Sequence, residues 1–118
     1  MASGYKTIYY ENGGIWYKGE YMNTIVHGSG TLYRRNGTIF YKGDYVNGVA
    51  HGMGTNYYEN GNILYKGEYA NGVAHRMGTS YYENGNIKFK GEWVNGRFKK
   101  RKRRKKRQGP PPAYKGLN

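Results

Sequence analysis

The chain has 118 residues, a formal net charge of +13 at pH 7, 15 tyrosines, 20 glycines and no cysteine. This length fits one domain or a repeat array of the same size, and the lack of cysteine excludes disulfides and thiolate metal sites. No apolar run is long enough to cross a membrane as a helix, and the first residues lead into no signal-peptide core, so we expect an intracellular protein.

The positive charge is concentrated near the C-terminus. Residues 1–96 contain nine Lys or Arg and seven Asp or Glu, whereas residues 97–118 contain eleven Lys or Arg and no acid. The first part is therefore close to neutral and the second is a polycation, so we expect the two parts to have different functions.

An aromatic-Lys-Gly-acid-aromatic pattern recurs every 24 residues, and a fixed period of this length indicates a repeat array. The framework positions are Tyr17, Gly19, Tyr21, Tyr41, Gly43, Tyr45, Tyr65, Gly67, Tyr69, Phe89, Gly91 and Trp93. The period divides the chain into a lead-in (1–6), four units (7–30, 31–54, 55–78 and 79–96), a polybasic arm (97–108) and a Pro-rich tail (109–118).

Within each unit, two β-prone runs flank a turn. In the third unit the first run is residues 55–58, and Asn60-Gly61 lies at the centre of the turn. Asn-Gly accepts positive φ at both positions of a two-residue hairpin turn, so it predicts a hairpin. The second run, residues 63–69, alternates between two faces as a strand does. A second Asn-Gly, at 71–72, is expected to open a longer link, residues 73–78, to the next unit.

The units therefore predict an all-β fold: an elongated, single-layer antiparallel β-meander of repeated hairpins with an irregular basic C-terminal tail. Glycine normally weakens the middle of a strand. Its recurrence between two aromatic residues suggests that each framework glycine leaves room for a neighbouring ring. Lys18 and Glu20 fall on one face together, as do their counterparts in every unit, which is typical of a solvated face.

His27, His51 and His75 form one candidate metal site. Equivalent residues of a meander lie two strands apart, roughly 9–10 Å. Zinc ligands must all lie about 2 Å from one ion, so we expect no metal here and a packing role for the imidazoles.

Glu20, Asp44, Glu68 and Glu92 form a candidate catalytic row. Their expected separation approaches the roughly 6.5–9.5 Å between the carboxyl groups of inverting glycosidases. A catalytic pair, however, needs two different environments to separate its pKa values, and the repeats predict identical ones. We therefore expect a protein that is not an enzyme and has neither a cofactor nor a small-molecule substrate.

The polybasic arm is the strongest candidate binding site. Its cations are Arg97, Lys99, Lys100, Arg101, Lys102, Arg103, Arg104, Lys105, Lys106 and Arg107. Such a run binds nucleic acid by releasing counterions, or an acidic membrane surface, and it also resembles a nuclear import signal. Because the run from 99 to 107 contains no aromatic residue, base stacking is not expected. A solubilising tail is the simpler alternative.

The Pro-rich tail contains Pro111, Pro112 and Tyr114 in a Pro-Pro-x-Tyr arrangement. This arrangement resembles ligands of WW domains, which bind as a polyproline helix. A rigid spacer that extends the reach of the arm is an equally good interpretation.

The order Tyr-x-Gly-x-Tyr/Trp-x-Asn-Gly, followed by His-Gly-x-Gly, resembles the MORN repeat. In the second unit, Gly48, Gly52 and Gly54 complete the likeness begun by the framework residues. The inserted Tyr-Tyr-Glu-Asn-Gly-Asn turn resembles the bacterial YwqK-like antitoxin subgroup. The sequence departs from the pattern where Thr24 and Arg76 replace glycines, and the fourth unit lacks its final His-Gly-x-Gly.

The resemblance implies an elongated, slightly twisted sheet with a non-catalytic role in scaffolding, oligomerisation or membrane apposition. Such repeats are abundant in large DNA viruses of algae and amoebae. Our leading hypothesis is a structural protein of a large assembly, specifically a minor capsid or virion protein, whose array contacts protein neighbours or a second copy and whose arm binds an anionic partner. The alternatives are a peripheral module that binds acidic lipids, a nucleic-acid-associated nuclear protein, and an antitoxin-like inhibitor.

Overall fold

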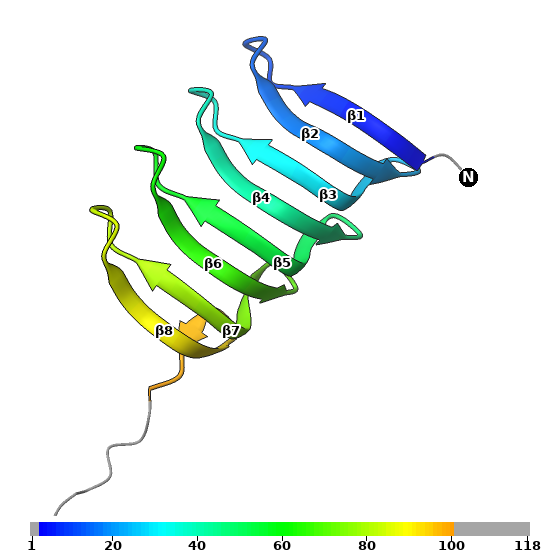
Figure 1. The fold of residues 1–118 in the computed structure, drawn as a ribbon. Coiled ribbons are helices and arrows are strands. Elements are labelled where there is room, and N and C mark those ends of the chain that lie inside the picture. The colour runs from blue at the N-terminus through cyan, green and yellow to red at the C-terminus, as the bar shows by residue number, and fades with distance from the viewer. Residues whose placement is uncertain (1–2, 101–118) are drawn as a thin grey trace, which may run out of the picture.

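The computed structural model describes residues 3–100, which form one sheet of nine antiparallel strands (Figure 1). The strands are β1 (Ser3–Tyr9), β2 (Ile15–Met22), β3 (Ile25–Tyr33), β4 (Ile39–Val46), β5 (Val49–Tyr57), β6 (Ile63–Ala70), β7 (Val73–Tyr81), β8 (Ile87–Val94) and β9 (Arg97–Phe98). Their order in the sheet is their order in the chain. The predicted all-β meander is therefore confirmed. The described residues contain no helix long and apolar enough to cross a membrane.

The turns after the odd-numbered strands β1, β3, β5 and β7 differ from the predicted two-residue type. After β5, the amide of Tyr58 donates to the carbonyl of Asn62 (2.8 Å) and that of Gly61 to the carbonyl of Tyr58 (3.0 Å), which closes a three-residue loop. Only Gly61 has positive φ (92°) in this loop. The Asn60 side chain accepts the amide of Asn62 (2.9 Å) and so favours the longer loop over the two-residue turn.

The second Asn-Gly pair forms the tight turn instead. Asn71 and Gly72 both have positive φ, 52° and 88°, and they alone connect β6 to β7. The predicted link at 73–78 is therefore wrong, because these residues belong to β7, where Gly78 pairs with Gly67. Likewise, Arg97 and Phe98, which we assigned to the arm, form β9 against the end of β8.

A continuous ladder of aromatic rings on one face forms the core. Its buried members are Tyr17, Tyr41, Tyr45, Tyr65, Tyr69 and Trp93. Successive rings meet edge to face with centroids 5.2 to 5.6 Å apart, an arrangement that favours aromatic pairs beyond the area they bury. A single-layer sheet thereby obtains a core without a second layer.

Pairs of glycines make room for the rings. A Cβ atom on Gly54 would lie 2.2 Å from the hydroxyl oxygen of Tyr41, and one on Gly43 would lie 2.5 Å from the Cα atom of Gly54. The framework glycine Gly43 was predicted to leave room for a ring. The structure divides this role between Gly43 and Gly54, because the Tyr41 ring lies mainly over Gly54. The ring tip also donates to the carbonyl of Asp44 (2.9 Å).

Side chains close both ends of the ladder. Lys6 on β1 stands where later periods have Gly30, Gly54 and Gly78, and its Nζ lies 4.8 Å from the centre of the Tyr21 ring. At the other end, Phe98 stacks on Phe89 (4.7 Å) and meets the edge of Trp93 (5.4 Å). A cation–π contact and an extra ring thus stand where further repeats would continue the ladder.

We expect Gly54→Ala to destabilise the protein by about 3 kcal/mol or more, because the added methyl group would overlap the Tyr41 ring. The matched control is Gly61→Ala. Among the described residues no atom lies within 4 Å of the place that a Cβ atom on Gly61 would take, so only the positive φ opposes alanine and a loss of about 1 kcal/mol is expected. Urea unfolding followed by circular dichroism measures both. Equal losses in the two variants would contradict the packing role of the glycine pair.

We also expect the protein to lose stability at alkaline pH. Burial raises the pKa of Tyr17 to about 12, with the Glu20 charge adding to the shift, and burial likewise raises the pKa of Tyr65 to about 12. Unfolded tyrosine ionises near 10. The unfolded chain therefore releases protons first, so the stabilisation is complete below about pH 10 and is lost as pH rises towards about 12.

The measurement is the unfolding midpoint as a function of pH, with tyrosinate absorbance recorded in parallel. Tyr9→Phe is the control, since Tyr9 is 60% exposed and lies outside the ladder. Full ionisation of all tyrosines near pH 10 without unfolding would contradict the expectation.

Candidate interaction surface

The two faces of the sheet differ in what covers them. In β4, Tyr41, Gly43 and Tyr45 lie on the side of the ring ladder, whereas Lys42 and the alternate residues on either side point the other way. We call this second side the open face. Its members on β2, β4, β6 and β8 include Lys18, Glu20, Met22, Phe40, Lys42, Asp44, Val46, Leu64, Lys66, Glu68, Lys90, Glu92 and Val94.

The open face carries most of the large apolar side chains that the described residues leave exposed. Met22, Ile25, Phe40, Val46, Val49, Met53, Leu64, Val73, Met77 and Val94 are each 37 to 56% exposed. The odd-strand members lie on this face because Ile25 pairs with Met22, and Met53 with Glu68. Exposed apolar side chains gathered on one face mark an interaction surface.

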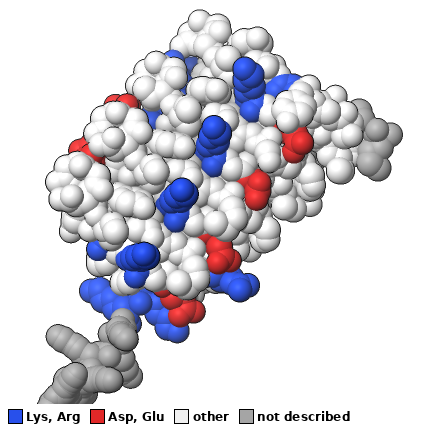
Figure 2. Space-filling view, viewed as in Figure 1, with Lys and Arg blue, Asp and Glu red and all other residues white. Residues whose placement is uncertain are grey.

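Two rows of opposite charge cross the open face side by side (Figure 2). One row alternates lysine and threonine: Thr31 pairs with Lys18 on one side and Lys42 on the other. The other row holds the acids, and Ser29 pairs with Asp44 in it. Within residues 3–100 the ion pairs are Arg76–Glu68 (3.4 Å) and Lys99–Glu92 (3.7 Å), so the two rows do not neutralise each other by direct contact.

The acids do not share one environment, contrary to the expectation from the repeat. Glu20 accepts the amide of Ser29 (2.7 Å), and Asp44 accepts the amide of Met53 (3.2 Å). Glu68 and Glu92 pair with cations instead, as given above. The difference at Glu68 follows from Arg76, which replaces the glycine found at positions 28 and 52.

Each of the three histidines accepts a hydrogen bond from a tight turn in the next unit. The Nδ1 atom of His27 accepts the amide of Asn47 (3.1 Å). His51 and His75 make the same bond to Asn71 (3.4 Å) and Asn95 (3.2 Å). No group of three or more His, Cys, Asp or Glu side chains among the described residues could hold a metal ion. The imidazoles are therefore turn-anchoring groups.

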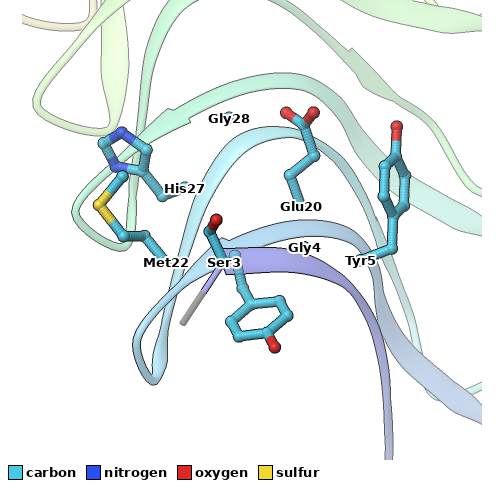
Figure 3. Close-up of a pocket in the computed structure, with 8 residues that line it drawn as sticks. Ser3, Gly4, Tyr5, Glu20, Met22, His27 and Gly28 are labelled. Atoms are coloured by element: carbon cyan, nitrogen blue, oxygen red, sulfur yellow. The ribbon is translucent and has the colours of Figure 1, made fainter. Parts of the chain in front are cut away.

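The open face is hollowed near the N-terminal end. A hollow of about 460 Å³ lies between Lys18 and Lys42, with Thr31 and Tyr33 in its lining and glycine backbone below. A second hollow, of about 280 Å³, opens beside β1 (Figure 3). There the imidazole of His27 lies next to Met22, and Glu20 and Tyr5 stand on the other side. Both hollows are wide open, which suits side chains of a partner better than an enclosed ligand.

Only the beginning of the predicted polybasic site lies in the described part of the chain. Arg97 is in β9, and the amide of Lys99 donates to the carbonyl of Glu92 (2.8 Å). Lys100 follows without regular structure. Arg101, Lys102, Arg103, Arg104, Lys105, Lys106 and Arg107, and the WW-type residues Pro111, Pro112 and Tyr114, lie outside the described residues. Their assignment as sites stays a prediction.

Sequence reasoning missed two features of this surface. The alternation of residues 40–46 could have revealed the apolar flanks of the charged rows, since Phe40 and Val46 share the parity of Lys42. The second feature is Arg76, which has φ of 73°, a left-handed conformation that a bulky residue rarely adopts. A single sequence shows the loss of the glycine but not that the backbone keeps the glycine conformation.

The MORN repeat family matches residues 17–39, 65–87 and 89–99, and the MORN repeat variant family matches residues 3–23 and 50–71. Together the matches extend over most of the sheet. The comparison with curated proteins gives no match.

We expect Arg76→Gly to stabilise the protein by about 0.5–1 kcal/mol. Glycine removes the left-handed strain of about 1–2 kcal/mol, while the lost Arg76–Glu68 surface pair is worth at most about 1 kcal/mol. The reciprocal variant Gly52→Arg should destabilise, because Gly52 has φ of 102° and a Cβ atom there would lie 3.0 Å from Asp44. Thermal unfolding of both proteins measures this, and a less stable Arg76→Gly protein would contradict it.

Proposed function

Because the chain belongs to the MORN-repeat proteins, we propose that it is a non-enzymatic scaffold whose open face binds protein and whose basic arm attaches it to an anionic partner. MORN repeats form protein-interaction or membrane-binding modules, and proteins of this family are generally not enzymes. The observation that carries the proposal is the gathering of exposed apolar side chains on the one face that the ring ladder leaves uncovered.

The distribution of charge supports separate roles for the sheet and the arm. Residues 1–96 carry nine cations and seven acids, so the sheet has little net attraction for a polyanion. The eleven cations of residues 97–118 have no acids among them. A protein contact on the sheet and an electrostatic contact on the arm can therefore act independently. The specific setting that we propose is a minor component of a large DNA virus particle, which rests on the abundance of the repeats in such viruses.

The test uses the full chain and two variants. In the first, the nine cations at positions 99–107 become glutamine. In the second, Lys18, Lys42, Lys66 and Lys90 of the open face become glutamine. The probes are a DNA duplex and vesicles containing phosphatidylserine, each titrated at several salt concentrations.

We expect the arm variant to lose binding to the duplex and the face variant to keep it. The logarithm of the wild-type affinity should fall linearly with the logarithm of salt concentration, by about 0.9 for each phosphate contact. Binding to acidic vesicles that survives neutralisation of the arm would instead make the sheet a lipid-binding surface. Sedimentation with purified virus particles tests the setting, and recovery only in soluble host fractions would contradict it.

A further inference from the structure

The open face of one copy is complementary in charge to the open face of a second copy whose strands run in the reverse direction. Along β4 the face reads Phe40, Lys42, Asp44, Val46, and along β6 it reads Leu64, Lys66, Glu68, Ala70. The order is apolar, positive, negative, apolar. Reversing the strand direction exchanges the two charges and leaves apolar residues on both flanks.

A two-fold axis that runs along the rows performs this reversal. It keeps each repeat opposite the same repeat of the second copy and places the lysine row over the acid row. The spacing matches without adjustment, because both rows repeat every two strands, roughly 9.5 Å. From this geometry we propose that the open face binds a second copy of this chain face to face, with Lys42 opposite Asp44 and Lys66 opposite Glu68 of that copy. The proposal deepens the proposed function, since it names the protein partner of the open face.

A second copy could also bind by extending the sheet at one of its edge strands, β1 or β9. At the N-terminal edge, a further repeat would place an aromatic ring where Lys6 stands. At each of the three equivalent positions a Cβ atom would lie 2.0 to 2.2 Å from the tyrosine hydroxyl of the preceding strand. Lys6 therefore blocks a ring-bearing strand. At the other edge, β9 of the same chain pairs with Trp93 and Val94 of β8. Lys6 thus opposes extension of the sheet at the N-terminal edge, and β9 covers the last two residues of β8 at the other edge.

The charges on the face also favour an intermolecular partner. None of Lys18, Lys42, Lys66 and Lys90 has an ion-pair partner among the described residues. The hollow of about 460 Å³ between Lys18 and Lys42 leaves room beside these two lysines for side chains of the second copy. Apolar residues such as Phe40 and Val46, 43 and 39% exposed, flank the charges and would lose water on contact.

A mixing experiment with two charge-reversed variants tests the proposed dimer. One variant carries Lys42→Glu and Lys66→Glu, and the other carries Asp44→Lys and Glu68→Lys. In either variant alone, like charges face each other across the two-fold axis, so self-association should weaken about a hundredfold or more. When the two variants are mixed, every charge again meets its opposite, and a heterodimer should form.

Sedimentation velocity of the full chain measures association, and circular dichroism verifies that each variant is folded. The control is Glu11→Lys with Glu83→Lys, which changes net charge as much as the acid variant but lies on the exposed turns; it should dimerise as wild type does. A carbodiimide cross-link between Lys42 and Asp44 that joins ¹⁴N- to ¹⁵N-labelled wild-type chains gives a readout that needs no variant.

Three results would overturn the proposal: a wild-type protein that stays monomeric, charge-reversed variants that dimerise alone like wild type, or a mixture that fails to associate. Each of these leaves arm binding to the duplex untouched. Failure of the dimer is therefore distinguishable from failure of the proposed attachment to an anionic partner.

Discussion

The tyrosine ring that lies across a pair of glycines is the contact on which the rest of this structure depends. A single layer of strands has no opposing sheet to bury its apolar face. Here the rings lie flat enough on their own sheet to cover it, and each covers backbone where a side chain would otherwise stand. Tyrosine suits the position better than an aliphatic residue, because its hydroxyl donates a hydrogen bond to the carbonyl of the residue three positions later in the chain. Between Tyr17 and Glu20 this bond is 2.6 Å long.

The sequence predicted the parts of the fold that periodicity controls. A 24-residue step and a two-residue alternation were enough to place the strands in order and to assign Tyr65 and Lys66 to opposite faces. Turn geometry was mispredicted because the same dipeptide, Asn-Gly, occurs in two different turns. Its conformation depends on whether a neighbouring amide, such as that of Asn62, can reach the asparagine side chain.

The periodicity of the sequence also could not predict the hydrogen bonds inside the ladder. Tyr69 donates to the side chain of Asn56. The equivalent hydroxyl of Tyr45 is buried and has no hydrogen-bond partner within residues 3–100, because leucine stands at position 32 where that asparagine would be. Equivalent positions therefore differ in energy although they look alike in the pattern. The candidate site shows the same limit: the charged rows followed from the repeat, but the separate partners of Glu20 and Glu68 depend on one exchanged residue, Arg76.

The strict neighbour-to-neighbour order of the strands has a consequence for folding. Within residues 3–100 every strand pairs only with strands next to it in the chain, so no strand pairing requires the closure of a long loop. Nucleation can begin at any hairpin and spread in both directions, and the stability of the whole approximates a sum of local and nearest-neighbour contributions. Opening should correspondingly start by fraying at β1 and β9, while the central hairpins persist in partly unfolded forms of the chain.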